Sequence, residues 1–237
     1  MNLVTEDDFR DLQNDRDKYT LIRYRDGSRS IIPRRFFLKN WQDEEANFGT
    51  LHIGRAVNIG IGSTVKVDSE NQGLRIGRFV AAGERVRFVL NAQHSINSIA
   101  MFNMACLGPG FRDAPIGQYG DTVLGNDLWI GDEAMFLGGC HIADGCVIGA
   151  RALVPANFKT EPYGIYVGSP ARLVRFRFPE KVRELLLALA WWEQPLAWIK
   201  AHMDGFGIDL TADEARSCEL LREMRATLPA NPEAAIA

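Results

Sequence analysis

An apolar residue recurs at every sixth position between residues 124 and 158, and this period constrains the fold more than any other feature of the chain. The residues that open the hexads are Leu124, Ile130, Phe136, Ile142, Ile148 and Val154. Four residues after each opener stand Leu128, Ala134, Cys140, Cys146, Ala152 and Phe158. A six-residue repeat is typical of a parallel β-helix, in which three hexads form one triangular coil. Each coil buries the apolar residues of its neighbour, so the core is built by stacking.

The same period occurs earlier in the chain and is then interrupted. Its earlier openers are Ile53, Ile59, Val65, Ile76, Ala82 and Phe88. Residues 94–121 have no period, yet they are rich in Phe, Met, Leu and Ile, so we do not expect them to be disordered. A long irregular segment inside a compact repeat domain is usually functional. The sequence therefore predicts a mainly β protein with a prism over residues 51–177 and a functional loop at 94–121.

Both flanks of the prism lack the period. In residues 1–50 we expect a short helix and then a β-hairpin at 19–37, because Asp26-Gly27 is a turn signal between apolar runs. This segment would cap the open first coil, whose exposed edge would otherwise invite aggregation. In residues 178–237 we expect α-helices and a tail. Pro179 suits the first turn of one helix, and Thr211 is placed to cap the last.

The composition excludes several classes of partner. The net charge is −3 and the pI is about 5.9, so the chain lacks the basic character of a nucleic-acid-binding protein. The longest apolar run, LLLALAWW, is too short to span a bilayer, and the acidic first twenty residues do not resemble a signal peptide. The four cysteines form no C-x-x-C pair. We therefore expect a cytoplasmic protein in which Cys140 and Cys146 are small core residues.

One of the four histidines stands out by its position. His94 lies where the second group of hexads ends and the irregular loop begins, and catalytic groups tend to sit where a loop leaves a rigid scaffold. From the residues alone, a catalytic His94 and a plain surface histidine are equally supported. A zinc site would need three gathered histidines, and only His94 is well placed. We therefore expect no metal site.

The span from Ile53 to Ile199 resembles the xenobiotic acetyltransferases, hexapeptide-repeat enzymes that acetylate chloramphenicol and streptogramin-type antibiotics. The resemblance rests on three motifs in the family's order. They are GDTVLGNDLWIGDEAMFLGGCHIADGCVIGA at 120–150, YVGSPARLVRFRF at 166–178, and LLLALAWW at 185–192. The resemblance implies a left-handed β-helix with C-terminal helices, assembled as a homotrimer whose active sites lie between subunits.

The resemblance also implies a reaction, the transfer of an acetyl group from acetyl-CoA as cosubstrate to a small-molecule hydroxyl, without a metal. His94, within residues 91–95, matches the place of the family's catalytic histidine and would act as general base in direct transfer. The residues implied in binding CoA are Trp129, Gly138, Gly139, Ala150, Lys159, Ser169, Arg172 and Arg175. The structural alternatives are packing at an interface for Trp129, corner geometry for Gly138, Gly139 and Ala150, and a solvated basic face for Ser169, Arg172 and Arg175.

The chain departs from the family pattern where the acceptor would bind. The family's N-H-R becomes Gln93-His94-Ser95, and its T-Y-P-F segment has no counterpart in residues 98–102. Lys159 lies in PANFKTEPY, which replaces a shorter family segment, so its equivalence rests on position alone. The acceptor is left open among an antibiotic, a sugar and a biosynthetic metabolite. Two alternatives also stay open: N- or O-acetylation of a sugar or nucleotide-sugar, and a prism that serves only as an assembly scaffold.

Overall fold

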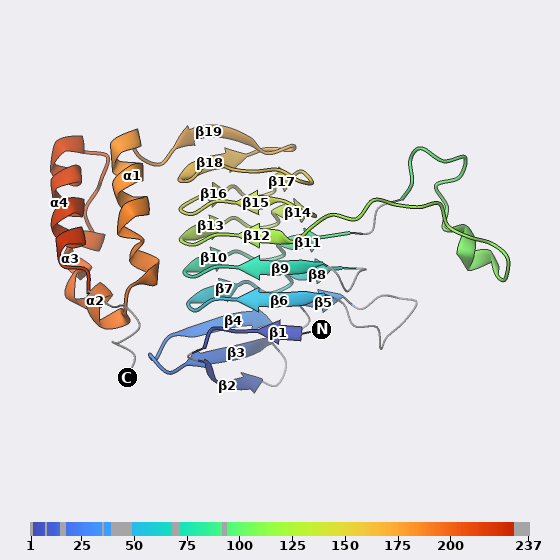
Figure 1. The fold of residues 1–237 in the computed structure, drawn as a ribbon, viewed down its shortest axis with the longest axis horizontal. Helices are drawn as coiled ribbons and strands as arrows, with labels where there is room; N and C mark the ends of the chain where they lie inside the picture. The colour runs from blue at the N-terminus through green and yellow to red at the C-terminus, as the bar shows by residue number, and fades with distance from the viewer. Residues whose placement is uncertain are drawn as a thin grey trace.

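The strands that the computed structural model describes are grouped in three sheets, which form the faces of a triangular prism (Figure 1). The structure describes residues 2–7, 9–14, 18–34, 36–38, 49–67, 72–91 and 94–229. In spatial order the first sheet contains β1 (Asn2–Val4), β6 (Thr50–Ile53), β9 (Gly73–Ile76), β12 (Thr122–Leu124) and β15 (His141–Ile142). The third sheet contains β17 (Leu153–Val154), β14 (Met135–Leu137), β11 (Arg87–Val89), β8 (Thr64–Lys66) and β5 (Phe37–Leu38).

The second sheet is longer because it continues beyond the prism at both ends. In spatial order it contains β19 (Arg172–Phe176), β18 (Gly164–Val167), β16 (Val147–Ile148), β13 (Leu128–Ile130), β10 (Val80–Ala82), β7 (Val57–Ile59), β4 (Arg29–Pro33), β3 (Tyr19–Tyr24) and β2 (Phe9–Asn14). From β4 to β18 the neighbouring strands are parallel. Successive coils rise from the N-terminal end and wind in the left-handed sense (Figure 1). The fold is thus the expected left-handed parallel β-helix with C-terminal helices.

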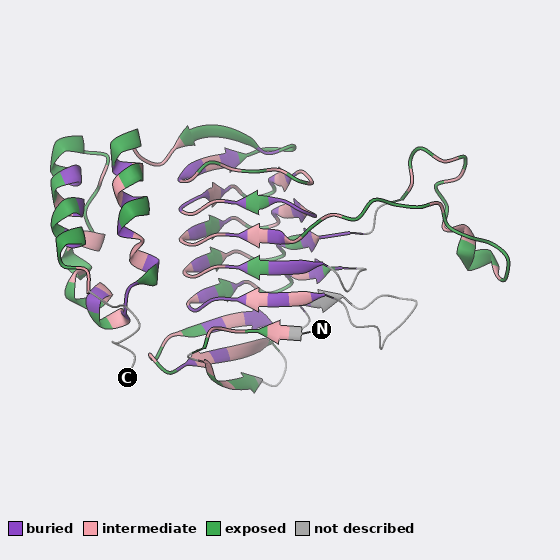
Figure 2. Ribbon diagram, in the orientation of Figure 1, coloured by how far each residue is buried: buried purple, intermediate pink, exposed green. Residues whose placement is uncertain are grey.

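The hexad openers stack in register inside the prism, as their period predicts. Ile53 pairs with Ile76, which pairs with Leu124, which pairs with Ile142 in the first sheet. All six openers between residues 124 and 158 are at most 2% exposed, so the core runs along the prism axis (Figure 2). In the third sheet the ring of Phe88 stacks on that of Phe136 with 5.0 Å between centroids. Apolar burial on this scale is the main stabilising term of such a fold.

The small residue that follows an opener is required by close approach between coils. A Cβ atom built on Gly131 would lie 2.4 Å from the backbone nitrogen of Ala150 in the next coil. Real Cβ atoms do not approach a neighbour that closely, so only glycine fits without a shift of the backbone. The position two residues after such a glycine tolerates a side chain. Asp127 and Glu133 stand there with positive φ values of 53° and 62°.

The N-terminal segment is built from strands, and the expected short helix is wrong. β1 pairs in parallel with β6, and β2 pairs antiparallel with β3, so residues 2–4 and 9–14 are extended. The hairpin expected around Asp26-Gly27 is present as the antiparallel pair β3 and β4. The helix fails to form because the first coil offers an unpaired strand edge, and pairing with it satisfies the backbone over a long range in sequence.

The C-terminal helices pack beside the prism and form a second apolar cluster (Figure 1). They are α1 (Glu180–Leu189), α2 (Leu196–Ala201), α3 (Met203–Phe206) and α4 (Glu214–Ala226). Pro179 precedes α1 as its N-cap residue. The expected cap of the last helix is wrong: Asp213, not Thr211, caps α4 and accepts a hydrogen bond from the Arg216 amide at 3.1 Å. Thr211 instead donates to Asp209 in the preceding turn. Among the described residues no helix is long and apolar enough to cross a bilayer.

Candidate active site

The loop of residues 94–121 leaves the prism between β11 and β12 and extends far from it (Figure 1). Its side chains are largely exposed (Figure 2). Large apolar side chains that the single chain leaves exposed include Ile96, Ile99, Met101, Phe102, Leu107, Phe111 and Ile116. Ile96 is 77% exposed, and so many large apolar side chains exposed in one loop are typical of an interaction or binding segment.

His94 is held by its own loop in a defined tautomer. The imidazole Nδ1 lies 2.5 Å from the carbonyl oxygen of Met101. A carbonyl can only accept a hydrogen bond, so Nδ1 carries the proton and donates it. In the neutral ring Nε2 then presents a lone pair, and the ring itself is exposed. This arrangement suits a general base that takes a proton at Nε2.

Leu90, which precedes the loop, and the C-terminal end of the loop are held to the prism by residues that the motifs did not single out. The buried amide Nε2 of Gln72 donates to the carbonyl of Leu90 at 3.2 Å and to that of Tyr119 at 2.8 Å. Asp121 accepts from the Gly73 amide at 2.7 Å and forms an ion pair with Arg75 at 2.9 Å. Asp121 could have been found from the sequence, because it belongs to the Gly-Asp-Thr motif at residues 120–122. Gln72 could not, because it lies where extra residues interrupt the hexad period and no motif is present.

The expected site residues fall into two groups on one chain. Gly138, Gly139 and Lys159 lie on the His94 side of the prism, where the third sheet turns into the first. The Asn157 amide donates to the Gly138 carbonyl at 3.0 Å. Lys159 bridges in parallel to His141 at the edge of the first sheet. Gly138 and Gly139 are both buried within the single chain, and the Gly139 amide donates to the Thr122 hydroxyl at 3.0 Å.

The second group lies on other faces of the prism. Trp129 is 63% exposed on the outer face of β13. Ala150 and Ser169 are exposed at the corners that follow β16 and β18. Arg172 and Arg175 are exposed on β19, and among the described residues neither forms an ion pair. One chain therefore does not bring Trp129 and the two arginines together with His94.

The cysteines on the prism are structural. Burial raises the pKa of Cys140 to about 12 and also raises the pKa of Cys146, so both are neutral thiols near pH 7. The thiolate is the reactive form, which removes them as nucleophiles. Across the described residues there is no cluster of three or more His, Cys, Asp or Glu side chains that could hold a metal ion.

Comparison with known proteins assigns the family. A probable macrolide acetyltransferase of Lysinibacillus sphaericus is 39% identical over 125 residues, which are 50% of this chain and 68% of that protein. The chain belongs to the xenobiotic acetyltransferase family. A chloramphenicol acetyltransferase of Escherichia coli is 40% identical over 136 residues, 55% of this chain and 64% of that protein. This xenobiotic acetyltransferase homologue thus spans slightly less than two thirds of that relative's length.

Two further comparisons concern the hexapeptide repeat and the fold. The family described as "Bacterial transferase hexapeptide (six repeats)" matches residues 121–156, the run in which the openers are most regular. Among solved structures, a galactoside acetyltransferase in complex with coenzyme A aligns with a TM-score of 0.38 and 22% identity. That alignment covers 53% of this xenobiotic acetyltransferase homologue and 55% of the galactoside enzyme.

Proposed function

We propose that the protein transfers an acetyl group from acetyl-CoA to a hydroxyl of a small amphipathic molecule, with His94 as general base. Nε2 of His94 takes the hydroxyl proton while the oxygen attacks the thioester carbonyl. The C–S bond then breaks, and the proton passes from the imidazolium to the thiolate of CoA. The observation that carries this proposal is the hydrogen bond from Nδ1 to the Met101 carbonyl, because it leaves Nε2 as the basic atom.

The proposed active unit is a homotrimer with sites between subunits. Two observations support it. Several large apolar side chains of the 94–121 loop, Ile96 and Ile99 among them, are exposed, and His94 lies on a different side of the prism from Trp129 and Arg175. Packing a neighbouring prism against the loop would bury the apolar side chains. It would also place His94 of one copy near the second group of another.

The second group is proposed to bind CoA. Arg172 and Arg175 would meet its phosphates, since neither is paired with a carboxylate among the described residues. Trp129 offers an exposed apolar face to the pantetheine arm, and Ala150 and Ser169 leave the backbone of their corners accessible. Lys159 would add positive charge on the His94 side. For Gly138 and Gly139 the geometry favours the corner role, because both are already covered within the chain.

The acceptor class follows from the loop and from the relatives. A loop rich in exposed Ile, Met and Phe suits an acceptor with a large apolar surface. The similar proteins named above are acetyltransferases of chloramphenicol and macrolides, and another, 36% identical, is a virginiamycin A acetyltransferase of Staphylococcus aureus. We propose the cytoplasm as the compartment, because none of the four cysteines, all of them described, is in a disulfide.

The test is acetyl-CoA-dependent thiol release with chloramphenicol, a macrolide, a streptogramin and sugars as acceptors. We expect release with an amphipathic acceptor, and a fall in kcat of roughly 10²–10⁴-fold in His94→Ala. His52→Ala is the matched control, since His52 lies on β6 outside the loop, and should keep wild-type turnover. Analytical ultracentrifugation should give a trimer for all three proteins. Release that survives in His94→Ala would refute the assignment of the base, and the absence of both release and acetyl-CoA binding would leave the scaffold alternative.

A further inference from the structure

The turn that carries the candidate base runs from His94 to Met101 and closes on itself. Its two ends meet where the imidazole Nδ1 donates to the Met101 carbonyl at 2.5 Å. Many turns are closed by a hydrogen bond between two backbone groups. Here, among the described residues, no backbone-to-backbone hydrogen bond involves any residue from 94 to 102. The shape of this turn therefore depends on its side chains.

Ser98 provides the contacts that cross the middle of this turn. Its hydroxyl donates to the Ala100 carbonyl at 2.8 Å and lies 3.2 Å from the Ser95 carbonyl, a second acceptor for the same proton. Ser98 is half-buried, while the residues on either side of it are exposed. One hydroxyl thus draws two carbonyl groups of the turn together.

The contact between Ser98 and Ala100 also restrains the carbonyl that binds His94. A peptide unit is planar, so fixing the Ala100 carbonyl fixes the plane that ends at the Cα atom of Met101. Only two backbone dihedral angles of Met101 then separate this plane from the Met101 carbonyl. Without the Ser98 hydroxyl the whole peptide unit is free to rotate, and the Met101 carbonyl is free to leave Nδ1.

We infer that Ser98 is a positioning residue for the general base, because its hydroxyl holds the turn in the form in which Met101 accepts from Nδ1. A neutral imidazole carries one proton, and the hydrogen bond made at one nitrogen decides which nitrogen holds it. Loss of the Met101 contact lets the proton move to Nε2, and a protonated Nε2 cannot take the proton of the acceptor hydroxyl. The effect on turnover rests on the proposed function, whereas the effect on the imidazole does not.

The first test reads the imidazole directly, by ¹⁵N NMR of the full chain labelled at histidine. The signals of His94 are identified by their absence from His94→Ala. Above the titration range of the ring, the wild type should show a protonated Nδ1 and an unprotonated Nε2. Ser98→Ala should show a mixture of the two neutral forms, and Ser98→Thr, which keeps the hydroxyl, should restore the wild-type pattern. A wild-type pattern in Ser98→Ala would overturn the inference.

The second test measures turnover with the acceptor that gives thiol release. In Ser98→Ala the kcat should fall about two- to tenfold, as expected for the loss of one hydrogen bond. The KM for acetyl-CoA should stay unchanged, because Arg172 and Arg175 lie on another face of the prism. An unchanged kcat would contradict the positioning role. If the wild type releases no thiol while the His94 tautomer responds to Ser98→Ala as predicted, the positioning role stands and the proposed function fails.

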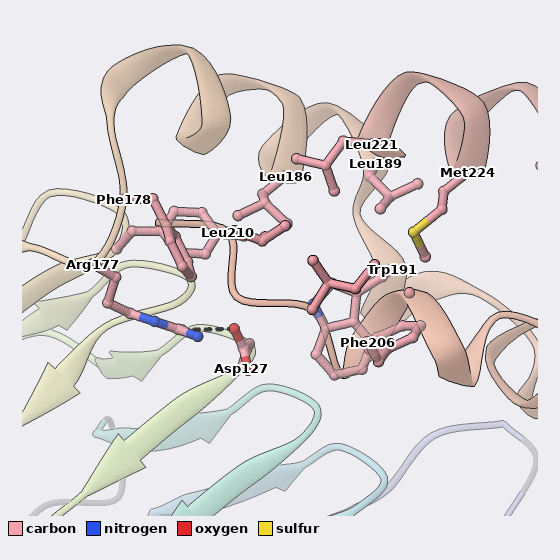
Figure 3. A pocket seen from close by; sticks show the side chains of 13 residues that line it. Asp127, Arg177, Phe178, Leu186, Leu189, Trp191, Phe206, Leu210, Leu221 and Met224 are labelled. Atoms are coloured by element: carbon pink, nitrogen blue, oxygen red, sulfur yellow. Dashed lines mark hydrogen bonds and ion pairs between the residues drawn. The ribbon is translucent and has the colours of Figure 1, made fainter. Parts of the chain in front are cut away.

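Ser217→Ala is the matched control for both tests. The Ser217 hydroxyl also donates to a backbone carbonyl, that of Leu210, at 3.2 Å. Leu210 lines a cavity of about 300 Å³ between the prism and the C-terminal helices (Figure 3). In Figure 1 these helices stand on the side of the prism opposite the 94–121 loop. This variant should keep the wild-type His94 signals and kcat. A loss of either would count against the inference, because the effect of Ser98→Ala would then not be specific to the turn.

Discussion

Replacing Gly138 by alanine tests whether this residue serves the corner of the prism or the binding of CoA. A Cβ atom built there would lie 1.9 Å from the Leu90 carbonyl oxygen and 2.8 Å from the ring of Tyr119. Leu90 directly follows β11, and Tyr119 lies at the C-terminal end of the 94–121 loop, so Gly138 and these two neighbours must separate by more than 1 Å to reach an ordinary contact. The added methyl therefore acts as overpacking at a buried site.

The cost can be worked out from the contacts that this shift weakens. Overpacking at a well-packed site costs about 1–3 kcal/mol. The hydrogen bonds from the Asn157 amide to Gly138 and from the Gly139 amide to Thr122, both 3.0 Å long, contribute about 0.5–1.5 kcal/mol each. The free energy of unfolding should thus fall by about 2–6 kcal/mol. At about 2–4 °C per kcal/mol for a chain of this length, the melting temperature should fall by roughly 10 °C.

The assay is thermal unfolding followed by far-UV circular dichroism. Gly117→Ala is the matched control, because no heavy atom lies within 4 Å of the Cβ position there, and its melting temperature should stay within about 2 °C of wild type. If Gly138 served mainly to admit the pantetheine arm, the variant would keep its melting temperature and raise the KM for acetyl-CoA. A Gly138→Ala protein that melts within about 2 °C of wild type would therefore refute the corner argument.

Three further predictions concern Phe136 in the core and the cysteines. Phe136→Ala removes a fully buried ring that stacks on Phe88, and it should lower the free energy of unfolding by about 3–5 kcal/mol, as measured by chemical denaturation. Phe136→Leu should lower it less, and equal losses in the two variants would contradict the role of the stack. At pH 8 a thiol reagent should modify the exposed Cys106 and leave Cys140 intact until the protein unfolds, as read by mass spectrometry. Because the folded pKa of Cys140 is raised from 9.0 to about 12, its contribution to stability is present below pH 9 and is lost as the pH rises towards 12. Cys140→Ala should therefore weaken the decline in melting temperature between pH 8 and 11, and an unchanged decline would contradict the raised pKa.

The sequence alone was sufficient for the parts of the fold that depend on contacts at a fixed separation. A hexad opener meets the opener one coil away, and in an uninterrupted coil this neighbour is three hexads along the chain. Leu124 and Ile142 show this directly by their pairing in the first sheet. The period therefore predicted which residues point inward and where the loop leaves the prism. It also placed His94 at that junction, although only the hydrogen bond to Met101 identifies its basic nitrogen.

The parts that sequence reasoning missed depend on contacts between distant segments. Residues 2–4 become a strand because β6, far along the chain, offers them an edge, and local propensity carries no sign of that edge. Gln72 clamps the loop by reaching two carbonyls that come together only when the coil closes.

The cavity beneath the C-terminal helices is likewise absent from any motif. It exists because α1 and α4 pack on each other and leave space above Asp127 and Tyr163. The sequence by itself determined the repeating unit, since each hexad carries its own inward residue and turn. The tertiary structure decided how the ends of the prism are capped, how the loop is anchored and where space remains, because those features arise from packing between segments that the period does not relate.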